Sequence, residues 1–378
     1  MIESILVKNA AILAPGGFVE RAWLLAAQGM IVALGRGPRP PKGADLEVDA
    51  DGRMLLPGFI DLHVHGGGGG SVHDARPESV RKMLDGHARH GTTSLLVTTF
   101  PDTPVRLRKI TKAISEGGEG HPALLGIHLE GPHLNPKKTG ALAPGKLRRL
   151  SIWELDDLNR ICGGLVRMIT LAPEIPGAIK LIRHCREKGI VTAIAHTCAT
   201  YKQVSKAVDA GLNHATHVPN TFVFAENARE PGGLEAVYLD DRITAQLIPD
   251  PEIVSPQFMQ IVLRMKGLTR IALITDAMRP AGLPGVKGPI RNKSKTIVGS
   301  TMTMSRAVRN VMKLGVPLEA AVAMASIQPA RIAGVEARKG SLAAGKDADF
   351  IITSKRLNCF MSVAGGKILH LSKTLKRN

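Results

Sequence analysis

The chain has 378 residues, of which 44% are hydrophobic and 22% are charged. This composition is typical of a globular protein, and the length allows one large barrel with a smaller domain. No apolar run in the sequence is long enough to cross a membrane, so we expect no membrane partner.

The charge balance is strongly basic, since 50 Lys and Arg residues against 32 Asp and Glu residues give a formal net charge of +18. Such an excess can steer an anionic substrate, bind nucleic acid or form a solvated basic surface. Aromatic residues are only 3% of the chain, whereas nucleic-acid binders place stacking rings among their charges. We therefore favour a solvated surface and expect no nucleic-acid partner. The basic clusters are scattered over Arg36–Lys42, Lys146–Arg149, Lys287–Lys295 and Lys373–Arg377.

The N-terminus and the cysteines indicate a cytoplasmic protein. Glu3 and Lys8 interrupt the first apolar segment, which makes it a poor match to a signal peptide. No C-x-x-C pair is present, and we expect reduced thiols. The four cysteines are Cys162, Cys185, Cys198 and Cys359.

Residues 1–57 predict a small β domain. Short apolar segments at Ser4–Lys8, Ala22–Ala27 and Met30–Ala33 are broken by Gly and Pro, as in strands joined by turns. The Pro- and Arg-rich stretch Gly35–Gly43 predicts a surface loop. No stretch here has helical periodicity.

From Pro57 onward, apolar strand segments alternate with amphipathic stretches such as Pro77–His90, Ile179–Lys188 and Tyr201–Ala210. This alternation predicts a parallel sheet covered by helices, and eight such units close as an α/β (β/α)8 TIM barrel. The eight predicted strands are Phe59–Val64, Ser94–Thr98, Ala123–Leu129, Val166–Leu171, Val191–Ala195, His214–Thr216, Ile243–Ile248 and Ile271–Ile274.

Two helices are predicted after the eighth strand. The first, Arg306–Leu314, would be capped by Ser305 and ended by Gly315, and the second would run from Pro317 to about residue 325. Strand character returns at Gly340–Leu342 and Ala348–Thr353. We therefore expect residues 1–57 and 345–378 to form one small β-sandwich domain and residues 58–344 to form the barrel.

Two histidines end the first barrel strand. His63 and His65 are two residues apart, so a strand points both side chains to one face, where they suit a divalent transition metal. The five glycines of Gly66–Gly70 would leave open space beside them. Alone, a His-x-His pair is a weak signal.

Further polar residues stand where other predicted strands end, which is the catalytic end of such barrels. Glu130, His196 and His217 would form a three-ligand site with an open position, as in catalytic zinc sites. A cation there lowers the pKa of a bound water, and Asp276 would be its general base. As alternatives, Asp276 could be a helix cap, and His128 could be either a ligand or a packed, hydrogen-bonded residue.

The remaining histidines predict no chemistry. His214, at the start of its strand, would be structural, because the bottom of a barrel carries stability. His133 is left open. Ordinary surface or packing roles are expected for His73, His87, His90, His121 and His184.

Eight short motifs along the chain resemble those of the amidohydrolase superfamily, and more closely those of the N-acetylglucosamine-6-phosphate deacetylases, in the same order. The matching stretches are Pro57–Gly66 (PGFIDLHVHG), Gly91–Ser94 (GTTS), His128–Pro132 (HLEGP), Leu171–Glu174 (LAPE), Thr216–His217, Arg229–Gly232 (REPG), Thr275–Met278 (TDAM) and Gly345–Asp349 (GKDAD).

The resemblance implies a metal on Glu130, His196 and His217, with Asp276 as the base and, in some members, a second metal on His63 and His65. Zinc is our first choice, with iron or another divalent ion as alternatives, at one or two ions per subunit. The resemblance also implies a homodimer. The substrate-contacting positions match Asn220, Thr221, Arg229 and Ala141, with Arg229 at the phosphate.

Three departures concern the substrate. The family's asparagine-alanine-methionine motif is here Asn220-Thr221-Phe222. Where the family has two substrate-contacting histidines, this chain has Leu142 and Ile253, which cannot hydrogen-bond. Losing a charge-assisted contact costs about 1.5–3 kcal/mol. His133 or Lys146 could replace them.

We therefore expect a metal-dependent deacetylase acting on an amino-sugar phosphate, converting N-acetylglucosamine-6-phosphate to glucosamine-6-phosphate and acetate in amino-sugar catabolism. The first alternative is an amidohydrolase acting on a different N-acyl sugar or a cyclic amide, which Leu142 and Ile253 motivate. The second is a sugar-binding protein that has kept the barrel and lost turnover.

Overall fold

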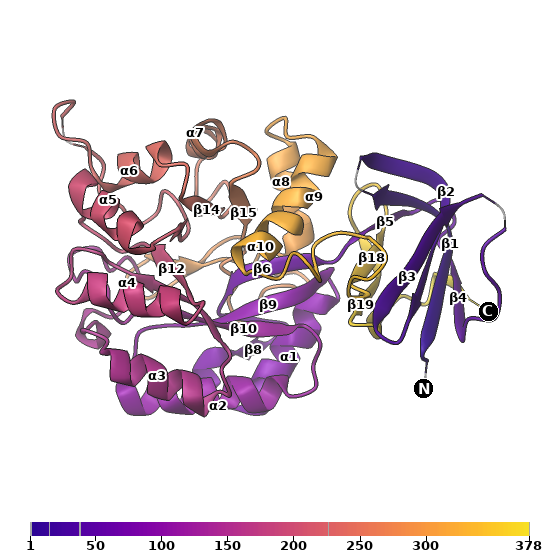
Figure 1. Ribbon diagram of the computed structural model, residues 1–378, viewed down its shortest axis with the longest axis horizontal. Coiled ribbons are helices and arrows are strands. Elements are labelled where there is room, and N and C mark those ends of the chain that lie inside the picture. Colours follow the sequence, from indigo (N-terminus) through magenta and orange to yellow (C-terminus); the bar gives the residue numbers. More distant parts are fainter. Residues whose placement is uncertain (1, 15, 38, 226, 378) are drawn as a thin grey trace.

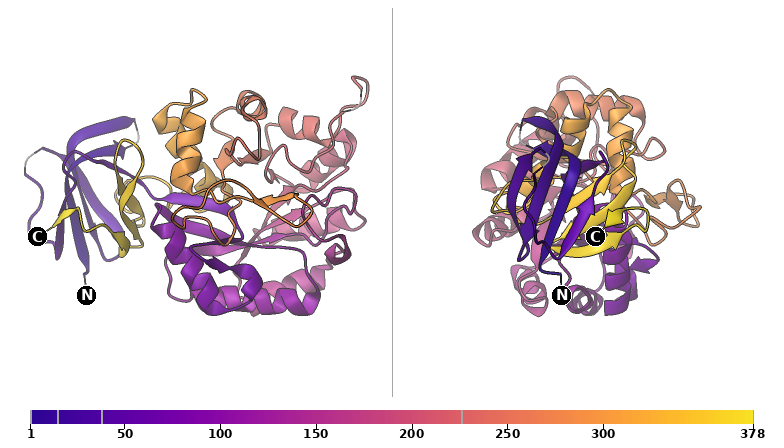
Figure 2. Two further views of the ribbon diagram at one scale, coloured as in Figure 1. Left: turned by 180° about the vertical axis from the view of Figure 1, so that it is seen from behind. Right: turned by 90° about the vertical axis from the view of Figure 1, so that its right-hand side faces the viewer.

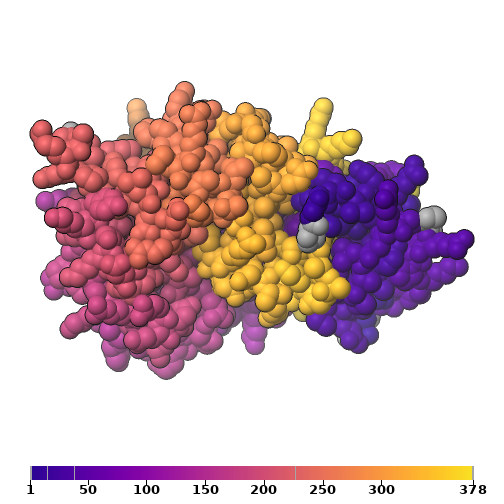
Figure 3. Space-filling view, turned by 45° about the horizontal axis from the view of Figure 1, so that its top comes forward, coloured from indigo at the N-terminus to yellow at the C-terminus, as the bar shows by residue number. Residues whose placement is uncertain are grey.

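The structure is a computed structural model that describes residues 2–14, 16–37, 39–225 and 227–377. A helix-covered barrel forms one part of the elongated molecule, and a domain of strands that holds both chain ends forms the other (Figure 1). In the space-filling view the indigo N-terminal strands lie directly beside the yellow C-terminal segment (Figure 3).

Eight parallel strands form the barrel wall, in the order β15-β14-β13-β12-β11-β10-β9-β6. Nearly all of their residues are buried, as expected for strands covered on both faces. The strands are β6 (Phe59–Val64), β9 (Thr92–Thr99), β10 (Leu124–Glu130), β11 (Val166–Leu171), β12 (Val191–Ile194), β13 (His214–Ala215), β14 (Thr244–Leu247) and β15 (Ile271–Leu273).

The barrel closes just beyond its eighth strand. Val64 at the end of β6 forms a parallel bridge with Ala277. The Asp276 N–H donates to the His63 carbonyl at 3.1 Å, and the His65 N–H donates to the Ala277 carbonyl at 2.9 Å. The seam therefore brings His63, His65 and Asp276 together at one end of the barrel.

Helices surround the wall (Figure 1). Their starts follow from local sequence: Pro begins α1, α2 and α7, and the N-termini of α2, α3, α5 and α7 are capped by the side chains of Thr103, Ser151, Thr200 and Ser255. The α-helices are α1 (Pro77–Ala88), α2 (Pro104–Gly118), α3 (Ile152–Ile161), α4 (Ala178–Glu187), α5 (Tyr201–Ala210), α6 (Gly233–Leu239), α7 (Pro256–Lys266), α8 (Met304–Met312), α9 (Leu318–Met324) and α10 (Ile327–Ile332).

Short elements decorate the loops. Two small hairpins pair β7 (Gly66–Gly67) with β8 (Gly70–Ser71) and β16 (Ile290–Arg291) with β17 (Ile297–Gly299). Single 3-10 turns lie at η1 (Val72–Asp74) and η2 (Pro144–Lys146). Among the described helices, none has both the length and the apolar character that a membrane span requires.

The small domain is one nine-stranded sheet in the order β20-β19-β18-β5-β1-β2-β3, with β4 pairing off β1 and β21 pairing with β4, so both chain ends contribute strands. Two strands, β4 and β5, pair with successive halves of β1, which has a register shift between Val7 and Ala10. The C-terminal strand β18 then pairs with β5, and an apolar core separate from that of the barrel fills the domain. Its strands are β1 (Ser4–Ala14), β2 (Gly17–Ala27), β3 (Met30–Arg36), β4 (Leu46–Asp49), β5 (Met54–Pro57), β18 (Phe350–Thr353), β19 (Cys359–Ala364), β20 (Lys367–Leu371) and β21 (Lys376–Arg377).

The predicted fold class is confirmed, and all eight barrel strands lie where the sequence placed them, within two residues at each end. Two details were wrong. Ser305 does not cap α8, because the helix already begins at Met304. The Ser305 hydroxyl donates instead to the His90 carbonyl at 2.9 Å. Gly340–Leu342 is a bend rather than a strand.

Candidate active site

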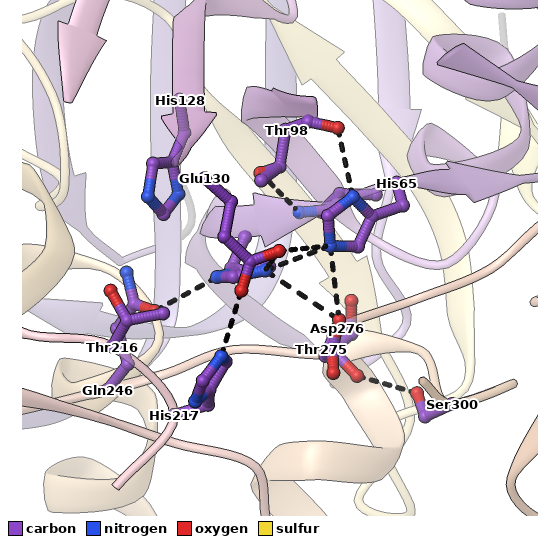
Figure 4. Close-up of polar contacts among 12 residues, drawn as sticks. His65, Thr98, His128, Glu130, Thr216, His217, Gln246, Thr275, Asp276 and Ser300 are labelled. Atoms are coloured by element: carbon purple, nitrogen blue, oxygen red, sulfur yellow. Dashed lines mark hydrogen bonds and ion pairs between the residues drawn. The ribbon is translucent and has the colours of Figure 1, made fainter. Parts of the chain in front are cut away.

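Six polar side chains converge at the C-terminal end of the barrel. His63 lies in β6 and His65 follows it, and Glu130 is the last residue of β10. The other three follow strands: His196 after β12, His217 after β13 and Asp276 after β15. Figure 4 shows Glu130 between His65 and His217, with Asp276 on the side of His65.

The Glu130 carboxylate lies at the centre of this cluster. Its Oε1 is 2.9 Å from His217 Nε2 and 3.2 Å from His196 Nε2. Its Oε2 faces the other pair, at 3.5 Å from His65 Nε2 and 3.8 Å from His63 Nε2. One carboxylate therefore joins two groups of possible ligands.

The second group is formed by His63, His65 and Asp276. The two Nε2 atoms lie 3.0 Å apart, and Asp276 Oδ1 is 3.4 Å from His65 Nε2 and 3.7 Å from His63 Nε2. In each group, one ligand atom from every member lies within 4.8 Å of the others. Each group is thus compact enough to surround one ion of its own.

The opposite ring nitrogens show that the donor set fits a cation. Three Nδ1 atoms contact oxygens that can only accept: Gln246 Oε1 at 3.2 Å from His63, the Thr98 carbonyl at 3.0 Å from His65 and the Lys138 carbonyl at 2.8 Å from His196. Each Nδ1 must therefore carry the proton, which leaves each Nε2 lone pair free to coordinate a metal.

Burial and neighbouring charges set the ionisation of the two carboxyl groups. Burial raises the pKa of Asp276 to about 7; His217 acts in the opposite direction, and the charges of Glu130 and Asp61 raise the pKa further. Burial would also raise the pKa of Glu130, but His63, His196 and His217 together hold it well below its usual value. The site therefore has one carboxylate fixed as an anion and one that can exchange a proton near neutral pH.

The backbone is strained where these side chains are presented. Positive φ angles occur at His196 (47°), His217 (34°), Asp276 (48°) and Thr221 (65°), in a region that L-residues rarely adopt. Thr221 supports one of them directly, because its hydroxyl accepts the His196 N–H at 2.9 Å. Such strain persists only where surrounding contacts fix it, and it is common at functional sites.

Four supporting residues were missed from the sequence. Asp61 accepts a hydrogen bond from the Thr275 hydroxyl at 2.5 Å and so holds the residue before Asp276. Burial raises the pKa of Asp61 to about 7. Gln246 orients His63, and the Phe100 ring stacks on His65 with centroids 3.7 Å apart. Glu174 accepts from the Thr197 hydroxyl at 2.6 Å, next to His196.

Some of these had a signal in the sequence. Asp61 shares the strand face of His63, and Gln246 is a polar residue inside an apolar strand segment. Glu174 belongs to one of the motifs that carry the family resemblance. For Phe100 the only signal was its position directly after a strand.

A cavity of about 340 Å³ opens above the cluster. Its walls include Ala141, Asn220 and Thr221, which the sequence predicted as substrate contacts, together with Leu142 and Ile253. Arg229 lies elsewhere, exposed on the loop before α6, where it lines a separate hollow with Phe224.

Neither suggested replacement for the missing histidines lines this cavity. Lys146 pairs with Asp102 at 2.8 Å, and His133 accepts the Leu150 N–H at 3.1 Å. The expectation of open space at Gly66–Gly70 was also wrong. A Cβ at Gly66 would lie 2.6 Å from the Arg279 backbone nitrogen, and one at Gly70 would lie 2.0 Å from the Ser79 carbonyl oxygen, so glycine is needed there for close packing.

Two other histidines of the barrel interior are packed and hydrogen-bonded. His128 lies between the Leu62 carbonyl, at 3.1 Å, and the Thr170 hydroxyl, at 2.7 Å. His214 contacts the Thr244 hydroxyl at 2.7 Å. Burial lowers the pKa of each to about 3, so both are neutral at physiological pH.

Known proteins are similar to this chain over most of its length. Residues 54–369 match the model of the amidohydrolase family. The chain is 35% identical to the N-acetylgalactosamine-6-phosphate deacetylase of Escherichia coli O157:H7, covering 90% of this chain and 93% of the relative. It is 30% identical to the N-acetylglucosamine-6-phosphate deacetylase of Bacillus subtilis (strain 168), covering 99% of both.

A solved structure of similar shape is a variant of N-acetyl-D-glucosamine-6-phosphate deacetylase from Mycobacterium smegmatis in complex with N-acetyl-D-glucosamine-6-phosphate. It superposes with a TM-score of 0.87 at 31% sequence identity, covering 97% of this chain and all of that one.

Proposed function

The chain belongs to the amidohydrolase family, and we propose that it hydrolyses the acetamide of an N-acetylated amino-sugar 6-phosphate, releasing acetate and the free amino-sugar phosphate. The observation that carries the proposal is the convergence of His63, His65, Glu130, His196, His217 and Asp276 in one buried cluster below a cavity.

Glu130, His196 and His217 would hold one divalent cation, and His63 and His65 a second. The cation would polarise the acetyl carbonyl and lower the pKa of the attacking water. Zinc suits the imidazole and carboxylate donors, and iron or another divalent ion fits the same set.

Asp276 acts as the general base and then as the general acid. Its Oδ1 takes a proton from the water that attacks the carbonyl carbon of the acetyl group. It then gives this proton to the amide nitrogen, the C–N bond breaks, and the amine leaves. A pKa of about 7 suits both transfers at neutral pH.

Asn220, Thr221 and Ala141 would contact the sugar and its acetyl group, because they line the cavity over the cluster. We keep Arg229 as a proposed substrate residue on the family resemblance. Residues 1–57 and 345–378 would form the small domain and residues 58–344 the barrel, which the separate cores support.

We further propose a cytoplasmic homodimer. Phe224 and Phe258 support an interface near α7, since their rings lie 5.6 Å apart and are 47% and 39% exposed.

The hexosamine itself has two candidates. The relatives above are named for glucosamine and galactosamine substrates, which differ only at C4, and the galactosamine enzyme is the more similar in sequence of the two. The test is acetate release by purified protein of known metal content. The panel is N-acetylglucosamine and N-acetylgalactosamine, each with and without the 6-phosphate. Acetate from a 6-phosphate supports the proposal, whereas tight sugar binding without acetate would make the chain a binding protein.

A further inference from the structure

The cavity above the metal-ligand cluster has two cationic side chains in its wall besides its histidines, Arg291 and Lys295. Both belong to the hairpin formed by β16 and β17, in the orange segment that extends over one side of the barrel (Figure 2). The catalytic chemistry proposed above uses neither of them.

The hairpin is tied directly to the catalytic residue. It ends at Gly299 and Ser300, and the Ser300 N–H donates to the Asp276 carbonyl at 2.8 Å. A Cβ at Gly299 would lie 2.6 Å from that same carbonyl oxygen, so only glycine allows this approach. The C-terminal end of the hairpin is therefore fixed beside the reaction centre.

Its turn is also well defined. The Lys295 N–H donates to the Asn292 carbonyl at 2.9 Å, and the Thr296 N–H donates to Asn292 Oδ1 at 3.0 Å. Arg291 Nη1 donates to the Lys295 carbonyl at 2.9 Å, which joins the two cationic residues across the turn.

The two charges have no anionic partner among the residues that the structure describes. By contrast, Arg279, at the start of the same segment, pairs with Asp74 at 2.6 Å. The guanidinium of Arg291 makes its one hydrogen bond to a carbonyl, and both side chains are exposed. An uncompensated cationic pair in a cavity wall attracts an anionic group of the ligand.

The rest of the cavity creates a need for such a pair. Leu142 and Ile253 line it and offer no hydrogen bond, and Arg229 lines a different hollow. A phosphate dianion in this cavity therefore finds its cationic partners within this chain on the hairpin.

We infer that Arg291 and Lys295 bind the 6-phosphate of the substrate and make the enzyme selective for phosphorylated sugars. This inference rests on the proposed function and adds the residues that set its substrate class. A guanidinium supplies several N–H donors in a fixed plane and the ammonium adds a second positive charge, a combination that suits phosphate oxygens.

The test compares kcat/KM for a 6-phosphorylated N-acetylhexosamine with that for the unphosphorylated sugar. In Arg291→Gln and in Lys295→Gln we expect the ratio of the two values to fall roughly 10-fold, and in the double variant roughly 100-fold, because each removes a charge-assisted contact. Inorganic phosphate should also inhibit the wild type competitively and the double variant much more weakly. Arg291→Lys, which keeps the charge, should retain part of the selectivity.

Lys293→Gln is the matched control, since Lys293 is exposed on the same hairpin and does not line the cavity. An unchanged ratio in the Arg291→Gln/Lys295→Gln double variant overturns the inference, as does a loss of selectivity found only in Arg229→Gln. A wild-type protein that releases no acetate from any sugar contradicts the proposed function instead, so the two failures are distinguishable.

Discussion

The floor and the rim of the cavity are built differently. The floor consists of His63, His65, Glu130, His196, His217 and Asp276, which strands present and which are nearly all buried. The rim consists of Ala141, Leu142, Asn220, Thr221, Ile253 and the β16–β17 hairpin, which loops carry and which are mostly half-buried or exposed. Parallel strands hold ligands in fixed geometry, whereas loops can change without disturbing the barrel. The chemistry of the site therefore belongs to the floor and its selectivity to the rim.

The largest effect is expected from Glu130→Gln in the floor. The amide keeps the shape of the side chain but loses its charge, and Glu130 is the residue that faces both ligand groups. We expect the purified variant to lose both bound metal and acetate release, measured by elemental analysis and an acetate assay. The exposed Glu319→Gln on α9 should retain both. Full metal content with normal turnover in Glu130→Gln would refute the role of Glu130 as a metal ligand.

Asp276→Asn should separate catalysis from metal binding within the floor. Glu130, His196 and His217 remain, so an ion at that group should still bind. Without a group to take and return the proton, kcat should fall about 10²- to 10⁴-fold. Steady-state kinetics with parallel metal analysis measure this, with Asp209→Asn on the exposed face of α5 as the control. A rate equal to that of the wild type would refute the assignment of the base.

A smaller effect, on metal affinity, is expected at Gln246, which lies behind the floor and contacts His63. Gln246→Leu removes the acceptor that holds the Nδ1 proton of His63, and loss of such a partner typically weakens metal binding about 10- to 100-fold. Chelator competition on the metal-loaded protein measures this affinity. Gln246→Glu keeps an acceptor oxygen and should bind more tightly than Gln246→Leu. If Gln246→Leu binds metal as tightly as the wild type, the orientation of His63 does not depend on this contact.

The same division explains how much the sequence could predict. The barrel strands are buried on both faces and therefore appear as continuous apolar runs, so each was located. The floor residues follow those runs and could be grouped before their distances were known. The positive φ angles of His196, His217 and Asp276 could not be predicted, because tertiary contacts rather than local preference fix them.

The rim was much less predictable. Lys287–Lys295 was one of four scattered basic clusters in the sequence, and we interpreted them as solvated surface. In the structure, Lys295 and Arg291 both line the wall of the cavity, because the end of their hairpin is hydrogen-bonded to the Asp276 backbone. Nothing in the local sequence specifies that approach. Likewise, Arg229 matches a family motif, yet it lies in another hollow, and its role stays a prediction.

The smallest expected effect is in the rim, at Asn220. Its backbone N–H donates to the His217 carbonyl at 2.8 Å, so the residue is fixed beside the floor while its side chain is half-buried at the cavity. Asn220→Ala removes one neutral hydrogen-bonding group, which corresponds to roughly a 2- to 10-fold loss in kcat/KM. Metal content should stay unchanged, and Asn358→Ala, exposed in the small domain, is the matched control. Loss of metal in Asn220→Ala would mean that this loop also shapes the floor, and that the two regions are not independent.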